Sequence, residues 1–105
     1  MNVITSKDNS IIKEIKKLKD RKVRSAKGEF IVEGFRFVEE ALKSDYEVKT
    51  LIIEESVESK LYSYNIDKYL DSINTIYVTK SIMKLLASTE TPQGVLAVVK
   101  NKDIE

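Results

Sequence analysis

The sequence contains no histidine and no cysteine, and it has only three glycines and one proline among 105 residues. Histidine is the commonest general base and the commonest transition-metal ligand, so its absence excludes a Ser-His-Asp or Cys-His arrangement within this chain. Without cysteine there is no disulfide framework and no thiolate metal site. Three glycines leave no room for a G-x-G-x-x-G turn or a P-loop. Catalysis by the remaining carboxylates, lysines and hydroxyls would have to be unusual, and we expect no catalytic or metal-binding residues.

Long apolar runs are also lacking. No segment approaches the roughly 20 consecutive apolar residues needed to span a bilayer. The N-terminus has no apolar central segment of the kind found in signal peptides. With 42% hydrophobic and 33% charged residues, the composition is typical of one compact globular domain. We therefore expect a cytoplasmic protein that does not bind membranes.

The small net charge of +1 hides two segments of opposite sign. Residues 1–28 contain nine basic and three acidic residues, a net charge of +6, whereas residues 29–105 carry a net charge of −5. Clustered lysines and arginines can neutralise phosphates and release their counterions, which drives binding to nucleic acids. A solvated helix surface is the alternative explanation, because lysine-rich surfaces are common in soluble proteins.

Hydrophobic periodicity predicts alternating helices and strands. The expected elements are, in chain order, a helix at 9–20, a basic connection at 21–28 that ends in Gly28, a strand at 30–32, a helix at 34–44, a strand at 51–53 approached through Val48, a helix at 56–71 that is irregular around Asn65, a strand at 76–78, a helix at 81–87 and a strand at 95–99. This alternation favours a layered α/β domain with a largely buried sheet.

Gly34 lies in the polar segment Glu33-Gly34-Phe35-Arg36, where a strand is expected to end and a helix to begin. Amides at a helix N-terminus offer hydrogen-bond donors and a partial positive charge to an anion. The guanidinium of Arg36 could grip a phosphate or stack on a base. The alternative is a tight turn at Gly34, with Arg36 paired to Glu33 or Glu40.

A second polar segment, Thr89-Glu90-Thr91-Pro92-Gln93-Gly94, precedes the last expected strand. The hydroxyls of Thr89 and Thr91 and the amide of Gln93 can form hydrogen bonds with phosphates, sugars or base edges. The alternative is a connecting turn in which Pro92 sets the φ angle and Gly94 relieves strain. Each segment is weak evidence when taken alone.

In this order, the segments resemble the N-terminal substrate-binding domain of SpoU/TrmH-type RNA 2′-O-ribose methyltransferases, part of the SPOUT class. The matching residues are Ile4-Thr5-Ser6, Asn9, Ile12-Lys13, Leu18, Arg21-Lys22, Arg24, Gly28-Glu29-Phe30-Ile31-Val32-Glu33-Gly34, Arg36, Val38-Glu39-Glu40-Ala41-Leu42, Leu86, Ser88-Thr89, Thr91-Pro92-Gln93-Gly94 and Val95-Leu96-Ala97-Val98-Val99. The middle of the chain, at 55–80, matches only in its hydrophobic pattern.

The resemblance implies a three-layer α/β/α sandwich with a four-stranded mixed sheet, similar to kink-turn-binding ribosomal proteins. It implies an RNA substrate-binding domain over 1–100, with a basic helix and connection at 1–28, an α/β core at 29–100 and the start of a linker at 101–105. The expected partner is structured RNA, either ribosomal or transfer RNA. The residues expected to contact it are Lys13, Lys17, Arg21, Lys22, Arg24, Gly34, Arg36, Thr89, Thr91 and Gln93.

In the resembled family, a C-terminal domain with a deep trefoil knot binds S-adenosylmethionine, holds the catalytic residues and forms most of the homodimer interface. The sequence stops at Glu105, where that domain would begin. We therefore expect this chain to bind RNA without a cofactor, and the full-length parent to be the S-adenosylmethionine-dependent enzyme. Two alternatives stay open: a stand-alone ribosomal-type protein that binds kinked RNA, and a protein-interaction module.

Overall fold

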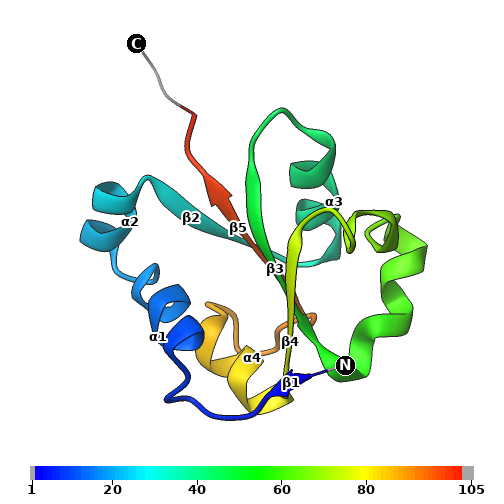
Figure 1. Cartoon of the computed structure of the whole chain (residues 1–105), viewed down its shortest axis with the longest axis horizontal. Coiled ribbons are helices and arrows are strands. Elements are labelled where there is room, and N and C mark those ends of the chain that lie inside the picture. Colours follow the sequence, from blue (N-terminus) through cyan, green and yellow to red (C-terminus); the bar gives the residue numbers. More distant parts are fainter. Residues whose placement is uncertain (1, 103–105) are drawn as a thin grey trace.

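The computed structural model describes residues 2–102 and consists of a five-stranded sheet with helices on both faces (Figure 1). Its elements are, in chain order, β1 (Val3–Ile4), α1 (Ser10–Lys17), α2 (Arg21–Lys27), β2 (Glu29–Glu33), α3 (Phe35–Lys43), β3 (Val48–Glu54), η1 (Glu55–Tyr64), η2 (Asp67–Tyr69), β4 (Asn74–Val78), α4 (Lys80–Leu86) and β5 (Val95–Lys100). The two η elements are 3-10 helices. No helix among the described residues is both long enough and apolar enough to cross a membrane.

The strands lie in the order β1-β4-β3-β5-β2. β1 and β3 run parallel to β4, whereas β5 is antiparallel to both of its neighbours, β3 and β2. Leu51–Glu54 of β3 and Val95–Val99 of β5 are buried throughout, because these strands lie inside the sheet and are covered on both faces. The α/β class and the mixed sheet predicted from the sequence are confirmed.

Alternate residues of the strands divide the core into two clusters, one on each face of the sheet. Ile52 and Leu96 pack with Ile12 of α1 on the face that α4 also covers. Leu51 packs with Val38 of α3 on the opposite face, where η1 and η2 complete the layer (Figure 1). The helices therefore hold the sheet from both sides and leave the ends of its strands accessible.

The predicted number of four strands is wrong, because β1 adds a fifth. Val3 and Ile4 pair in parallel with Tyr77 and Val78 of β4. A strand of two residues is too short to show the alternation from which strands are predicted, so the sequence carried no usable signal for it.

The predicted connection at 21–28 is also wrong, because this segment is the helix α2. Asp20 caps the helix by accepting a hydrogen bond from the backbone N–H of Lys22 at 2.8 Å, and Gly28 ends it in the left-handed region with φ of 66°. No residue of α2 is buried. The helix therefore lacks the apolar stripe that hydrophobic periodicity detects.

The other elements agree with the predictions to within a few residues. The expected irregularity at Asn65 is confirmed, since this residue adopts φ of 59° between η1 and η2. The helix expected at 9–20 is shorter and ends at Lys17. Of the linker expected at 101–105, residues 103–105 lie outside the described part, and Asn101 still bonds to the carbonyl of Gly28 at 2.8 Å.

Glu14 joins α1 to α2. Its Oε2 accepts a hydrogen bond from Nζ of Lys27 at 2.8 Å, and its Oε1 accepts one from Nζ of Lys17 at 2.9 Å. These two bonds, with that from Lys27 the stronger, lower the pKa of Glu14 to about 2. The carboxylate therefore stays charged at pH values at which an unpaired glutamate is protonated.

Replacing Lys27 with alanine should raise the pKa of Glu14 toward its ordinary value of 4.5, because the largest cause of the shift is removed. The folded-state pKa is depressed, so the stabilisation is present above pH 4.5 and is lost as the pH falls through about 2. An NMR titration of the Glu14 side chain measures this, with Lys16→Ala as a control of equal charge loss on α1, the helix that carries Glu14. An unchanged Glu14 titration in Lys27→Ala would contradict the assignment.

Candidate functional site

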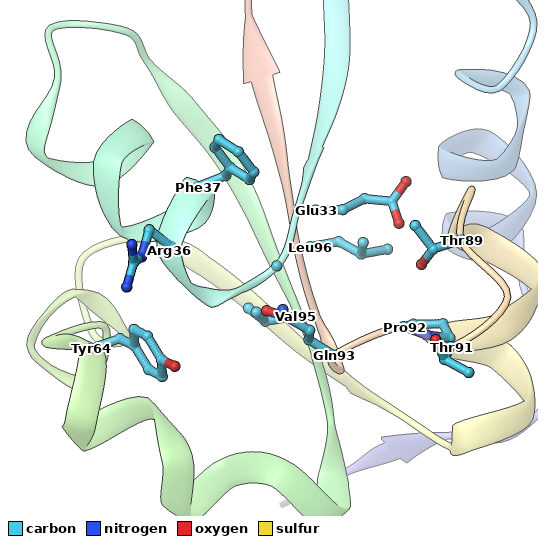
Figure 2. Close-up of a pocket in the computed structure, with 11 residues that line it drawn as sticks. Glu33, Arg36, Phe37, Tyr64, Thr89, Thr91, Pro92, Gln93, Val95 and Leu96 are labelled. Atoms are coloured by element: carbon cyan, nitrogen blue, oxygen red, sulfur yellow. The ribbon is translucent and has the colours of Figure 1, made fainter.

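The two polar glycine segments meet at one pocket of about 560 Å³ (Figure 2). One wall comes from the junction of β2 and α3 at Glu33–Phe37, and the other comes from the 89–93 loop that precedes β5. Tyr64 of η1 lines the side nearest Arg36. Folding thus brings together residues that are more than 50 positions apart in the sequence.

The backbone amides of Gly34 and Phe35 form hydrogen bonds to the facing segment at 93–95. The backbone N–H of Gly34 donates to the carbonyl of Val95 at 3.0 Å. The backbone N–H of Phe35 donates to Oε1 of Gln93 at 2.8 Å. Gly34 occupies the N-cap position of α3 and has no side chain, and Gln93 supplies an acceptor for the amide of Phe35, one of the first-turn amides that have no partner within the helix.

Glycine is strongly favoured at position 34. Its φ of 96° lies in a region that other residues rarely adopt, and a Cβ atom there would lie 2.9 Å from Oε1 of Gln93. The residue is therefore required by the turn and by the close approach of Gln93. Any contribution of Gly34 to ligand binding comes from this geometry.

Arg36 is exposed in the first turn of α3, and no acidic residue shares that turn. It forms no ion pair with any residue of the described chain, so the predicted alternative of pairing with Glu33 or Glu40 is not realised. Beneath it the ring of Phe35 stacks on that of Tyr64, with centroids 4.9 Å apart and planes at 17°. This stack holds η1 against the start of α3.

Glu33, the last residue of β2, forms a hydrogen bond to the opposite side of the pocket. Its Oε2 accepts a hydrogen bond from the backbone N–H of Ser88 at 2.9 Å. Its Oε1 is buried and has no hydrogen-bond partner within residues 2–102. The alternative of a pair between Glu33 and Arg36 is therefore not formed, and the backbone contact to Ser88 carries no signal that a sequence pattern could reveal.

The cations of the N-terminal segment do not line this pocket. Those predicted to contact RNA are Lys13, Lys17, Arg21, Lys22 and Arg24. Two of them are held by neighbours: Lys17 pairs with Glu14, and the guanidinium of Arg24 donates to the carbonyls of Leu18 and Lys19 at 3.0 and 2.9 Å. The others are exposed, and contact of the whole group with RNA stays a prediction.

A second cavity of about 520 Å³ adjoins the first, and Thr91 and Pro92 line both. Its other walls include Glu54, Lys60 and Lys80, none of which the sequence analysis selected. These residues come from β3, η1 and α4, so only the tertiary fold brings them together. No group of three or more potential acidic metal ligands occurs within the described residues.

Comparison with known proteins identifies the family of this domain. A family model described as the MRM3-like substrate binding domain matches residues 9–97. The chain belongs to this family. It is 32% identical over 99 residues to the 23S rRNA (guanosine(2553)-2′-O)-methyltransferase RlmP of Bacillus subtilis (strain 168), a match that covers 93% of this chain and 37% of that protein. The chain thus spans little more than a third of the length of this curated relative.

Solved structures show the same fold. An RNA 2′-O ribose methyltransferase superposes with a TM-score of 0.82 and 26% identity, over 97% of this chain and 38% of the other. The AdoMet complex of the SpoU methyltransferase AviRb from Streptomyces viridochromogenes superposes with a TM-score of 0.69 and 25% identity, over 90% of this chain and 36% of the other. An AdoMet-bound rRNA methyltransferase from Sinorhizobium meliloti superposes with a TM-score of 0.73, over 96% of this chain and 37% of the other. At 22% identity, this likeness is informative for the fold alone.

The contact between Gly34 and Gln93 predicts a coupled effect on stability. Gly34→Ala should lower the free energy of unfolding by about 1–3 kcal/mol because the backbone is strained, and Gln93→Ala by about 1 kcal/mol because a cap is lost. The double variant should lose less free energy of unfolding than the sum of the two single losses, since Gln93→Ala removes the atom with which the new Cβ collides. Urea denaturation of the four proteins measures this cycle.

Gly28 offers the matched control. Its φ of 66° is also positive, but a Cβ there would meet nothing within 4 Å. Gly28→Ala should therefore destabilise less than Gly34→Ala, and its effect should add to that of Gln93→Ala. Equal coupling of Gln93 to both glycines would contradict the proposed contact.

Proposed function

We propose that this domain binds RNA as the substrate-recognition part of an rRNA 2′-O-ribose methyltransferase. The observation that carries the proposal is the convergence of Arg36, Thr89, Thr91 and Gln93 on one pocket in a member of a substrate-binding family. A cation, two hydroxyls and an amide are the side-chain types that contact phosphate, sugar and base edges.

The electrostatics of α3 supports an anionic ligand at this pocket. The N-terminus of a helix carries a partial positive charge, so a cation in the first turn is unfavourable for the helix itself. Arg36 occupies that turn, which holds no acidic residue. A phosphate bound there would interact favourably with both the guanidinium and the helix terminus.

The uncharged residues of the pocket offer hydrogen bonds to the RNA. Thr89 and Thr91 are exposed, so their hydroxyls are accessible to sugar and phosphate oxygens. Gln93 uses Oε1 to cap α3, and its Nε2 forms no hydrogen bond to the described chain, which leaves that group for RNA. Gly34 contributes the turn that lets the two walls approach each other.

We further propose that the N-terminal cations extend this surface. Lys13, Arg21 and Lys22 are exposed and form no ion pair within the described residues, so they are placed to meet phosphates directly. Lys17 and Arg24 would first have to leave Glu14 and the end of α1. The RNA-binding unit would then be residues 1–100.

For the longer parent protein we propose a cytoplasmic, homodimeric enzyme in which another domain binds S-adenosylmethionine and transfers the methyl group. Two relatives of known structure are AdoMet complexes, which supports this cofactor for the parent. Ribosomal RNA is preferred over transfer RNA, since the named substrate of RlmP is 23S rRNA. A likeness to kink-turn-binding ribosomal proteins remains part of the proposal.

The test is the affinity for a 23S rRNA fragment that contains guanosine 2553, measured over a series of salt concentrations and compared with a transfer RNA. Binding should weaken with salt, and Arg36→Ala should reduce the slope of log K against log salt by about 0.7–0.9, the contribution of one phosphate contact. The melting temperature of Arg36→Ala should not fall, because the helix loses an unfavourable charge.

Lys43→Ala is the control, since it removes an equal charge from the opposite end of the same helix. It should leave the slope unchanged. Absence of binding at low salt, or a slope that does not depend on Arg36, would reject the proposal. Tight binding of transfer RNA alone would reject the ribosomal substrate.

A further inference from the structure

The second cavity has a chemistry of its own. Glu54 from the end of β3, Lys60 of η1 and Lys80 of α4 line it together with Thr91 and Pro92. A smaller cavity of about 210 Å³ continues along the same loop past Lys84 and Glu90. The cavity thus places one buried acid among several surface cations, directly behind the wall of the first pocket.

Glu54 is the unusual member of this group, because it is a largely buried acid that keeps one carboxylate oxygen accessible from the cavity. The residue is 7% exposed and is the only buried charged residue within the described chain. Ser56 donates its hydroxyl to Oε2, whereas Oε1 accepts no hydrogen bond and no cation lies within ion-pairing distance in residues 2–102. Because Oε1 is not among the fully buried polar atoms, a donor that enters the cavity can reach it.

Lys60 and Lys80 are exposed and form no ion pair within the described residues. Lys80 is the first residue of α4, and no acid shares that turn. This position is unfavourable for a cation in the same way as that of Arg36, because the helix dipole opposes it. The helix structure therefore gives no reason for a lysine at position 80.

We propose that this cavity is a ribose-phosphate subsite of the RNA-binding surface. The free oxygen of Glu54 accepts a hydrogen bond from a ribose 2′-hydroxyl, and Lys60 and Lys80 contact the phosphates on either side of that sugar. Glu54 and Glu90 disfavour an isolated anion, whereas a sugar that carries a donor satisfies the carboxylate. The 2′-hydroxyl is the group by which proteins distinguish RNA from DNA. This inference rests on the proposed function.

The decisive comparison uses the same 23S rRNA fragment with ordinary ribose and with 2′-fluoro ribose throughout. The fluorinated RNA keeps its charge and its A-form helix but has no 2′-hydroxyl donor. The unaltered domain should bind ordinary RNA roughly tenfold more tightly, as expected for one hydrogen bond to a charged group. Equal binding of both RNAs with normal salt dependence would overturn the subsite and leave the proposed function intact.

Two variants separate the contact of Glu54 with the sugar from the contacts of the lysines with the phosphates. Glu54→Gln keeps the volume but replaces the charged acceptor with a neutral one, so it should reduce the preference for ordinary RNA severalfold. The double variant with Lys60→Ala and Lys80→Ala should weaken the binding of both RNAs equally. It should also reduce the slope of log K against log salt by about 1.5, the contribution of two phosphate contacts. Lys43→Ala with Lys68→Ala is the control, since these lysines line neither cavity.

Thermal melting distinguishes these effects from damage to the fold. The melting temperature of the Lys60 and Lys80 variant should stay the same or rise, because an unfavourable charge leaves α4. A preference for ordinary RNA that survives Glu54→Gln unchanged would overturn the role of Glu54. A salt slope that falls no further than in the lysine control would overturn the phosphate contacts. Absence of binding by the unaltered domain would reject the proposed function itself.

Discussion

The arrangement of the site depends on how the N-terminus of α3 is satisfied. Gly34 cannot cap the helix with a side chain, and the acceptor comes instead from Gln93, 58 residues further along the chain. The same residue therefore fixes the start of the helix and the position of the loop. Because a Cβ at position 34 would collide with Gln93, the turn, the cap and the opening of the pocket are one geometric requirement.

Positive charge at helix starts is the second organising feature. Arg36 and Lys80 each lie in the first turn of a helix, a turn that holds no acidic residue, on opposite sides of the Thr91–Pro92 wall. Each position weakens its own helix slightly. Natural proteins retain such local conflicts mainly where function requires them. The larger cluster of cations in α1 and α2 is partly used within the protein, by Glu14 and by the end of α1.

Sequence patterns predicted the elements that bury a periodic apolar face, as in α3 with Phe35 and Val38. They missed α2, in which no residue is fully buried, and β1, which is two residues long. The two glycine segments were identifiable because glycine and proline mark backbone that regular elements cannot supply. Glu54, Lys60 and Lys80 were not identifiable, since separate elements carry them and their relation exists only after the sheet and helices are packed.

The position of β5 has a consequence for the order in which the domain folds. β2 lies at the edge of the sheet and, within residues 2–102, pairs only with β5, which follows every other strand of that range in the sequence. During synthesis, β2 therefore waits until residues 95–100 have left the ribosome before it gains its partner. Contacts between distant segments form slowly because a long loop must close first. Both walls of the pocket belong to these two strands and their connections, so the site is complete only when the fold is complete.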